Sequence, residues 1–206
     1  MRPAIAIAAL AFAAGAQAQG EIERLFQAIA EGKEPVAAIL VLGGKVDVQA
    51  RNAQRETPLH RAAEKGMRAL TRHLLEAGAS VRSRTSTGET PLHLATLPAE
   101  TACALLLLDA GADPRARNDE GESVLHWAAL GGNPALVQLM LERGADPAIV
   151  DLRGNTPFHG AADSGHVEVV RILLGRARNP EAKNLEGKAA QDFARERGHE
   201  DVLKLF

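Results

Sequence analysis

The chain has 206 residues, of which 46% are hydrophobic and 24% are charged, and this is the composition of an ordinary globular protein. Aromatic residues make up only 3%, so a core must be built from small aliphatic side chains, which suit closely stacked helices. The formal net charge of −2 gives no reason to expect nucleic acid or another polyanion as a partner.

The first residues predict an export signal. Arg2 supplies a positive charge before an apolar run over 4–14, and Ala16-Gln17-Ala18 has the small-x-small pattern of a cleavage site. We therefore expect residues 1–18 to be a signal peptide that is cleaved after Ala18, and the mature protein to be periplasmic or secreted. The alternative is an alanine-rich helix at the start of a cytosolic protein. The apolar run is too short to span a bilayer, so no membrane insertion is expected.

Residues 19–51 come next and show two helical patterns, Glu21–Gly32 and Val36–Leu42. This pair of helices is expected to be a divergent repeat that caps the N-terminal end of a stack, where only one side is packed. Cys103 is the one cysteine of the chain, which excludes an intramolecular disulfide. It lies in an apolar helical run and is expected to be buried, with an intermolecular disulfide as a minor alternative.

A tetrapeptide then occurs four times at a spacing of 33 residues. Its copies are Thr57-Pro58-Leu59-His60, Thr90-Pro91-Leu92-His93, Ser123-Val124-Leu125-His126 and Thr156-Pro157-Phe158-His159. A period of this size is typical of stacked supersecondary units. It predicts four repeats, over 52–84, 85–117, 118–150 and 151–183, followed by a C-terminal capping repeat over 184–206 in which the tetrapeptide is lost.

Each repeat is expected to hold two short helices. Thr57 is a good N-cap and Pro58 a good first residue for the first helix, and the second helix ends before Gly78. Ser123 and Val124 replace Thr and Pro in the third copy, so we expect that helix start to be weaker.

These repeats resemble the ankyrin repeat. The family pattern Asp/Asn-x-x-Gly-x-Thr-Pro-Leu-His-x-Ala-Ala-x-x-Gly is matched at nearly every fixed place by residues 151–165, and the second-helix ending Leu-Leu-x-x-Gly-Ala-Asp by residues 107–113. The resemblance covers about residues 21–206. It implies an all-α repeat solenoid of helix-turn-helix units joined by hairpin loops, in which the repeated histidine hydrogen-bonds the loop backbone. The framework residues carried over are Thr57, His60, Thr90, His93, His126, Thr156 and His159.

The hairpins between repeats carry type I turn signatures, with Asn or Asp first and Gly fourth. The turn over 52–55 lacks the glycine and ends in Arg55, so it is expected to be the most strained or mobile. Residues that flank each turn face one another, which predicts cross-strand ion pairs. The predicted pairs are Arg51 with Glu56, Arg84 with Glu89, and Arg117 with Glu122. Because each arginine has a carboxylate opposite, the alternative of a phosphate-binding basic ladder is disfavoured.

The four histidines of the tetrapeptides are expected to form a column with neighbours about 10 Å apart, the spacing of adjacent helices. Zinc needs its ligands ~2.0–2.1 Å from a shared centre, so a metal site is not expected. The sequence holds no phosphate-binding Gly-rich loop, no zinc-protease motif and no nucleophile elbow. We therefore expect a protein that is not an enzyme and uses no cofactor.

Repeat stacks bind partners on a concave face made by hairpin tips and the first helix of each pair. The resemblance places the variable contact positions there. The candidate contact residues are Gln54, Lys65, Ser86, Thr87, Leu97, Asp119, Glu120, Trp127, Leu130, Leu152 and Arg153. Trp127 is the leading anchor because tryptophan is enriched at binding hot spots. The alternative is that Trp127 is a packing residue buried between repeats.

The sequence thus predicts a monomeric, exported bacterial ankyrin-repeat protein that binds a protein partner of unknown identity. Two alternatives stay open. One is an inhibitor-like effector or enzyme that acts on a periplasmic target. The other is a helper or protective factor for a periplasmic enzyme, such as an oxidative-stress enzyme, and rests on analogy with the family alone.

Overall fold

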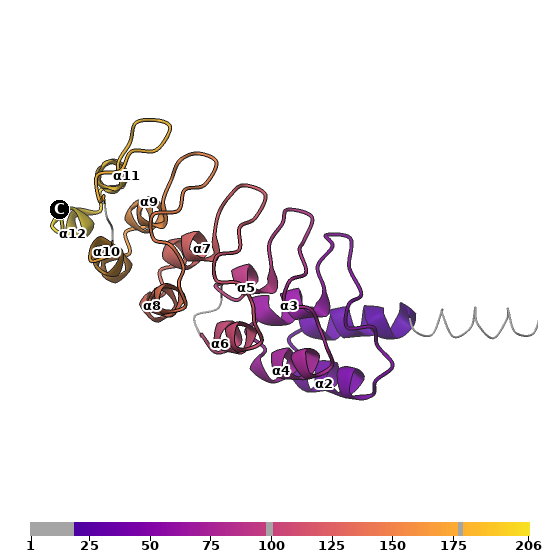
Figure 1. Cartoon of the computed structure of the whole chain (residues 1–206). Helices are drawn as coiled ribbons and strands as arrows, with labels where there is room; N and C mark the ends of the chain where they lie inside the picture. The colour runs from indigo at the N-terminus through magenta and orange to yellow at the C-terminus, as the bar shows by residue number, and fades with distance from the viewer. Residues whose placement is uncertain (1–18, 98–100, 177–178) are drawn as a thin grey trace, which may run out of the picture.

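The protein is a stack of short helix pairs in the computed structural model, which describes residues 19–97, 101–176 and 179–206 (Figure 1). The predicted signal peptide lies outside these residues. The regular structure of the described parts is helical, apart from one isolated bridge between Arg117 and Ser123. The predicted all-α repeat solenoid is therefore confirmed.

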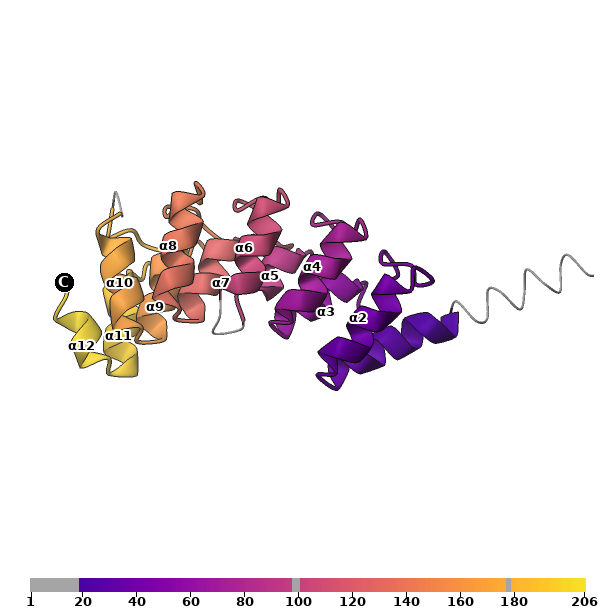
Figure 2. The same cartoon turned by 90° about the horizontal axis from the view of Figure 1, so that it is seen from below.

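The helices form two rows, seen from two directions in Figures 1 and 2. The inner row carries the hairpins and contains α3 (Pro58–Glu64), α5 (Pro91–Leu94), α7 (Val124–Leu130), α9 (Pro157–Asp163) and α11 (Ala190–Arg197). The outer row contains α2 (Glu34–Leu42), α4 (Arg68–Glu76), α6 (Ala102–Asp109), α8 (Pro134–Glu142), α10 (Val167–Leu174) and α12 (Glu200–Leu203). Residues 19–30 are also helical and lie at the N-terminal end of the stack. All the hairpins project from the same side of the inner row (Figure 1).

The inner helices start in the same way because the histidine closes the first turn. The backbone N–H of Thr57 donates to Nδ1 of His60 at 3.1 Å, and the same contact recurs in the three later tetrapeptides. Ser123 has the same extended conformation as the threonines, and its Oγ also accepts from the backbone N–H of His126. The expected weaker start of α7 is therefore not seen. Asp192 takes the place of the histidine in α11 and accepts from the backbone N–H of Ala189.

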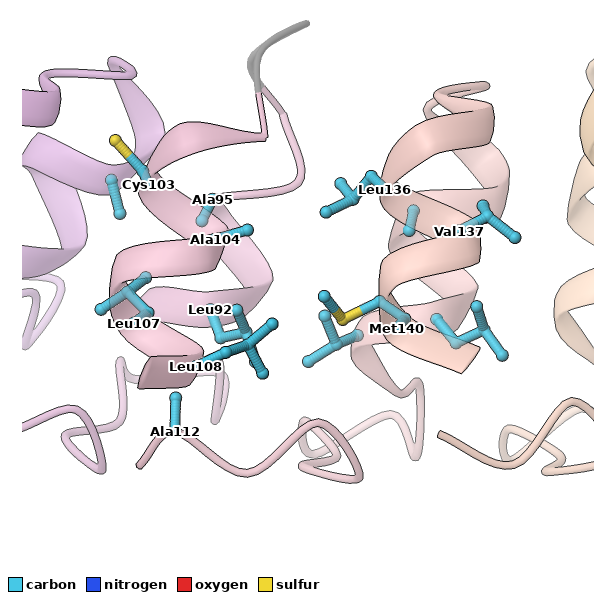
Figure 3. Close-up of a cluster of buried hydrophobic side chains, with 14 of the residues drawn as sticks. Leu92, Ala95, Cys103, Ala104, Leu107, Leu108, Ala112, Leu136, Val137 and Met140 are labelled. Carbon is cyan, nitrogen blue, oxygen red and sulfur yellow. The ribbon is translucent and has the colours of Figure 1, made fainter. Parts of the chain in front are cut away.

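The core lies between the two rows and is made almost entirely of leucine, valine and alanine. Figure 3 shows part of it, where Leu92 and Ala95 face Ala104, Leu107 and Leu108 of the outer row. Alanine has no side chain beyond Cβ, so it lets helices approach closely while leucine fills the space between them. Cys103 belongs to the same layer and is buried.

The five hairpin turns need a left-handed residue at their fourth position. Gly88, Gly121, Gly154 and Gly187 hold it with φ between +77° and +86°, whereas Arg55 holds it at φ +60°. Arg55 is the sole non-glycine residue with positive φ in the described parts of the chain. A side chain costs free energy in this region, so the first hairpin is strained as the sequence predicted.

Replacement of Arg55 by glycine is expected to stabilise the stack by about 1 kcal/mol, because it relieves the left-handed strain. Arg55 is exposed and forms no side-chain hydrogen bond or ion pair in the structure, so the substitution removes no such contact. Urea denaturation of the two proteins measures the difference. Gln54→Gly, which leaves the strained conformation of Arg55 in place, is the control and is expected not to raise the free energy of unfolding.

Candidate functional site

The hairpin tips form a continuous edge along one side of the inner row. Each tip donates one backbone N–H to a carbonyl of the tip before it, at 2.9–3.0 Å. These bonds run from Ser86 to Gln54, from Asp119 to Thr87, from Leu152 to Glu120 and from Leu185 to Arg153. The predicted contact residues at the tips are therefore held in fixed register from one repeat to the next.

The predicted arginine–glutamate pairs across the hairpins are wrong. Each arginine instead reaches a backbone carbonyl 33 residues further on, so that it joins neighbouring repeats. The guanidinium of Arg51 donates to the carbonyl of Arg84 at 2.9 Å, that of Arg84 to the carbonyl of Arg117 at 2.7 Å, and that of Arg117 to the carbonyl of Val150 at 2.6 Å. Stacking of the repeats brings the carbonyls of the adjacent hairpin within hydrogen-bond reach of the guanidinium groups.

The glutamates accept hydrogen bonds from neutral donors within their own hairpins, and Glu56 also lies 3.8 Å from the guanidinium of Arg61. Nδ2 of Asn52 donates to Glu56 at 2.6 Å and Nδ2 of Asn118 donates to Glu122 at 2.9 Å, while Glu89 accepts from the hydroxyls of two threonines. The first residue of each turn therefore takes the role that the sequence analysis assigned to the arginine. The side chain of this residue donates a hydrogen bond to the glutamate, and its side-chain oxygen accepts from a backbone N–H of the turn.

The repeated histidines tie each repeat to the next. Nε2 of His60 lies 3.2 Å from the carbonyl of Glu89, and those of His126 and His159 lie 2.9 Å and 3.1 Å from the corresponding carbonyls 29 residues on. A carbonyl can only accept, so Nε2 carries the proton and Nδ1 accepts from the cap. Nε2 of His93 is buried and has no hydrogen-bond partner, so the step from its repeat to the next lacks this bond.

Burial keeps these four imidazoles neutral. It lowers the pKa of His93 to about 4 and also lowers the pKa of His60, His126 and His159 below the ordinary histidine value, because a charged ring is poorly solvated there. Both nitrogens of each paired ring are engaged with protein groups, which leaves none for a ligand. Within the described residues, no group of three or more His, Cys, Asp or Glu side chains could hold a metal ion.

Trp127 is neither free nor fully buried. Its indole N–H donates to Glu122 at 2.8 Å, and its ring meets that of His93 edge-to-face with centroids 5.7 Å apart. The residue as a whole is partly exposed. Trp127 therefore packs between two repeats without being fully buried, and its role as an anchor for a partner stays a prediction.

The other predicted contact residues lie where a partner could reach them. Leu130 is 53% exposed at the C-terminal end of α7, and Leu97 is 56% exposed three residues after the end of α5. Leu152 is 68% exposed at a hairpin tip. The polar members of the set are exposed as well: Gln54, Lys65, Ser86, Thr87, Asp119, Glu120 and Arg153. Asp119 is within 3.5 Å of the guanidinium of Arg84. The set thus spreads over one face rather than meeting at a single point.

Comparison with protein families agrees with this geometry. The family model for ankyrin repeats in three copies matches residues 25–118, 99–185 and 125–206. The chain belongs to the ankyrin-repeat family. Members of this family are generally protein–protein interaction modules and typically have no enzymatic activity. A search of curated proteins found no match.

The ankyrin stack has one hollow on its inner side that the sequence analysis missed. Its volume is about 250 Å³, and it lies over α9 with Trp127 and Leu130 on one side and Phe193 on the other. The remaining walls come from Glu122, His126, Asp151, Arg153, Asn155, Thr156, His159, Gly160 and Asp163. The signal that could have found it is the residue after the repeated histidine, or after Asp192 where that replaces the histidine. This residue is Trp127 in one repeat, Gly160 in the next and Phe193 in the last.

No helix of the ankyrin stack within the described residues is long and apolar enough to cross a membrane. The helices of the inner row are at most eight residues long and alternate with polar hairpins.

Proposed function

We propose that this ankyrin-repeat protein is a non-enzymatic binding module that docks one protein partner on the face formed by the inner helices and hairpin tips. The observation that carries the proposal is the exposure of Leu97 and Leu130, at equivalent positions of neighbouring repeats, together with the partial exposure of Trp127 on the same helix as Leu130. Apolar side chains that gather on one face of a soluble fold indicate an interaction surface. Asp119 and Glu120 add an acidic tip beside them.

The proposed place of action is the periplasm. Support comes from the sequence, where Arg2, the apolar run over 4–14 and the Ala16-Gln17-Ala18 motif have the order of an export signal. N-terminal sequencing of the mature protein tests this, with Gln19 expected as the first residue.

Replacement of both Leu97 and Leu130 by serine is expected to weaken binding of the partner by about tenfold or more, because two apolar anchors of the face are lost. Both side chains are more than half exposed, so the melting temperature is expected to change little. Binding is measured with the partner isolated by photocrosslinking from position 130 in the native host. Crosslinking from Ala135 on the outer row is the control.

The proposal fails if position 130 gives no specific crosslink while position 135 does, or if the double variant binds the isolated partner as tightly as the wild type. The first result would place the contact on the outer row, because Ala135 is exposed there on α8. The second would show that Leu97 and Leu130 do not anchor the partner.

A further inference from the structure

In two repeats, the residue that follows the histidine position covers the histidine of the repeat before it. Trp127 meets the ring of His93 and Phe193 meets the ring of His159, in both cases edge-to-face at 5.7 Å. Gly160 stands at the same place between them and has no side chain with which to cover His126. His126 is accordingly 8% exposed, against 0% for His93 and 2% for His159. The hollow is the space that a side chain at position 160 would fill.

Neither the backbone nor the packing requires glycine at position 160. Gly160 lies inside α9 without a positive φ, and a Cβ built on it would meet only Leu130, at 3.9–4.0 Å. Glycine inside a helix lowers the equilibrium constant for folding relative to alanine by about fivefold at most, so it is a cost to the fold. The glycine serves to keep the hollow open.

The walls of the hollow fit a cation carried on an aliphatic stem. Its two ends are the aromatic rings of Trp127 and Phe193, whose faces attract cations, and Phe193 already has the ammonium of Lys188 5.6 Å from its centroid. The wall residues Glu122 and Asp151 accept only from neutral donors, and neither has a cation within 4.0 Å in the described structure.

The charges around the hollow favour a cation over an anion. Asp163, the third carboxylate of the wall, is paired with Arg197 at 2.8 Å, and Arg153 is the one guanidinium among the lining residues. Among the lining residues, two carboxylates, those of Glu122 and Asp151, therefore have no positive partner, whereas there is one free guanidinium, that of Arg153. The volume of about 250 Å³ is below that of pockets for drug-sized ligands and suits a single long side chain.

We propose that the hollow over Gly160 binds the side chain of one arginine or lysine in an extended segment of the protein partner. The inference rests on the proposed function, since it names the anchor that the partner presents to the inner face. The aliphatic stem would lie between Trp127 and Leu130, with its charged end toward Glu122.

Two synthetic peptides test the inference directly: acetyl-Gly-Ser-Arg-Ser-Gly-amide and its twin with citrulline, which has the shape of arginine without the charge. Trp127 is the one tryptophan of the chain, so its indole N–H gives a single nuclear magnetic resonance signal that reports on the hollow. The arginine peptide is expected to shift that signal saturably with a Kd on the order of 1 mM. The citrulline peptide is expected to bind at least about tenfold more weakly.

Two variants locate the contact. Gly160→Leu fills the hollow and is expected to abolish the shift while the melting temperature stays equal or rises, because leucine favours the helix. Glu122→Gln keeps an oxygen to accept from Asn118 and Trp127 and is expected to weaken the arginine peptide about fivefold or more. Arg61→Leu, at the same place of the repeat over 52–84, is the matched control and is expected to leave the shift unchanged.

Equal binding of the citrulline and arginine peptides would show an apolar rather than a cationic site and overturn the inference. So would an unchanged shift in Gly160→Leu, or no saturable shift with either peptide. These failures are distinct from failure of the proposed function. If Gly160→Leu still gives the crosslink from position 130 and binds the partner with wild-type affinity, the inner face binds its partner without a side chain in the hollow. In that case the inference is wrong and the proposed function stands.

Discussion

Acidification from pH 7 to pH 4 is expected to remove about 3 kcal/mol of folding stability through His93 alone. The pKa of this histidine is about 4 in the folded protein and 6.5 without burial, so the unfolded chain binds more protons between these values. Its contribution to stability is therefore complete above pH 6.5 and is lost as the pH falls toward 4. Chemical denaturation at pH 7, 5.5 and 4.5 measures the loss.

Burial, rather than the charged groups around His93, sets the direction in which its pKa shifts. Glu89 and Glu122 raise its pKa and Arg84 lowers it, but burial is the largest cause and lowers it. His60, His126 and His159 add to the acid sensitivity in the same direction because burial lowers the pKa of each. His93→Gln is expected to be less stable at pH 7 and to take up about one proton fewer on unfolding at pH 5. An unchanged proton uptake in that variant would contradict the assignment.

Replacement of Leu107 by alanine is expected to cost 2–5 kcal/mol, roughly the range for a fully buried leucine whose cavity cannot collapse. Leu107 has no exposed surface and lies between the inner and outer rows (Figure 3). Each repeat of a stack contacts only its neighbours, so damage to a central repeat also weakens the coupling between the repeats on either side of it. The loss is measured by urea denaturation at pH 7.

Leu105 is the matched control because it lies on the same helix, α6, and is 37% exposed. Its replacement by alanine is expected to cost less than about 1 kcal/mol, since little apolar surface is lost from the core. Equal losses for the two variants would mean that α6 is not packed as the structure shows.

Most of the fold could be predicted from the sequence because the repeated residues act locally. The threonine, proline and histidine of three tetrapeptides, and Ser123 with His126 in the fourth, start a helix within their own repeat, and the period of 33 residues sets the stacking. The strain at Arg55 was predictable for the same reason, since a turn position that needs positive φ is recognised by its missing glycine.

The contacts between repeats could not be predicted in this way. The partners of Arg51, Arg84 and Arg117 lie 33 residues along the chain, and a hydrogen bond to a backbone carbonyl leaves no trace in the side chains of the sequence. The sequence pointed instead to the glutamates opposite each arginine on the same hairpin as partners, and that prediction was wrong. The hollow over Gly160 was missed because it depends on three repeats at once.

The sequence by itself determined the repeat architecture, the helix starts and the face on which a partner is expected, because these follow from local conformational preferences copied at a fixed interval. The tertiary structure decided that Trp127 packs against His93 and yet stays partly exposed, and it created the space between Trp127 and Phe193. The physical reason is that stacking brings residues 33 and 66 positions apart side by side, so that the absence of a side chain at Gly160 becomes a feature of the surface.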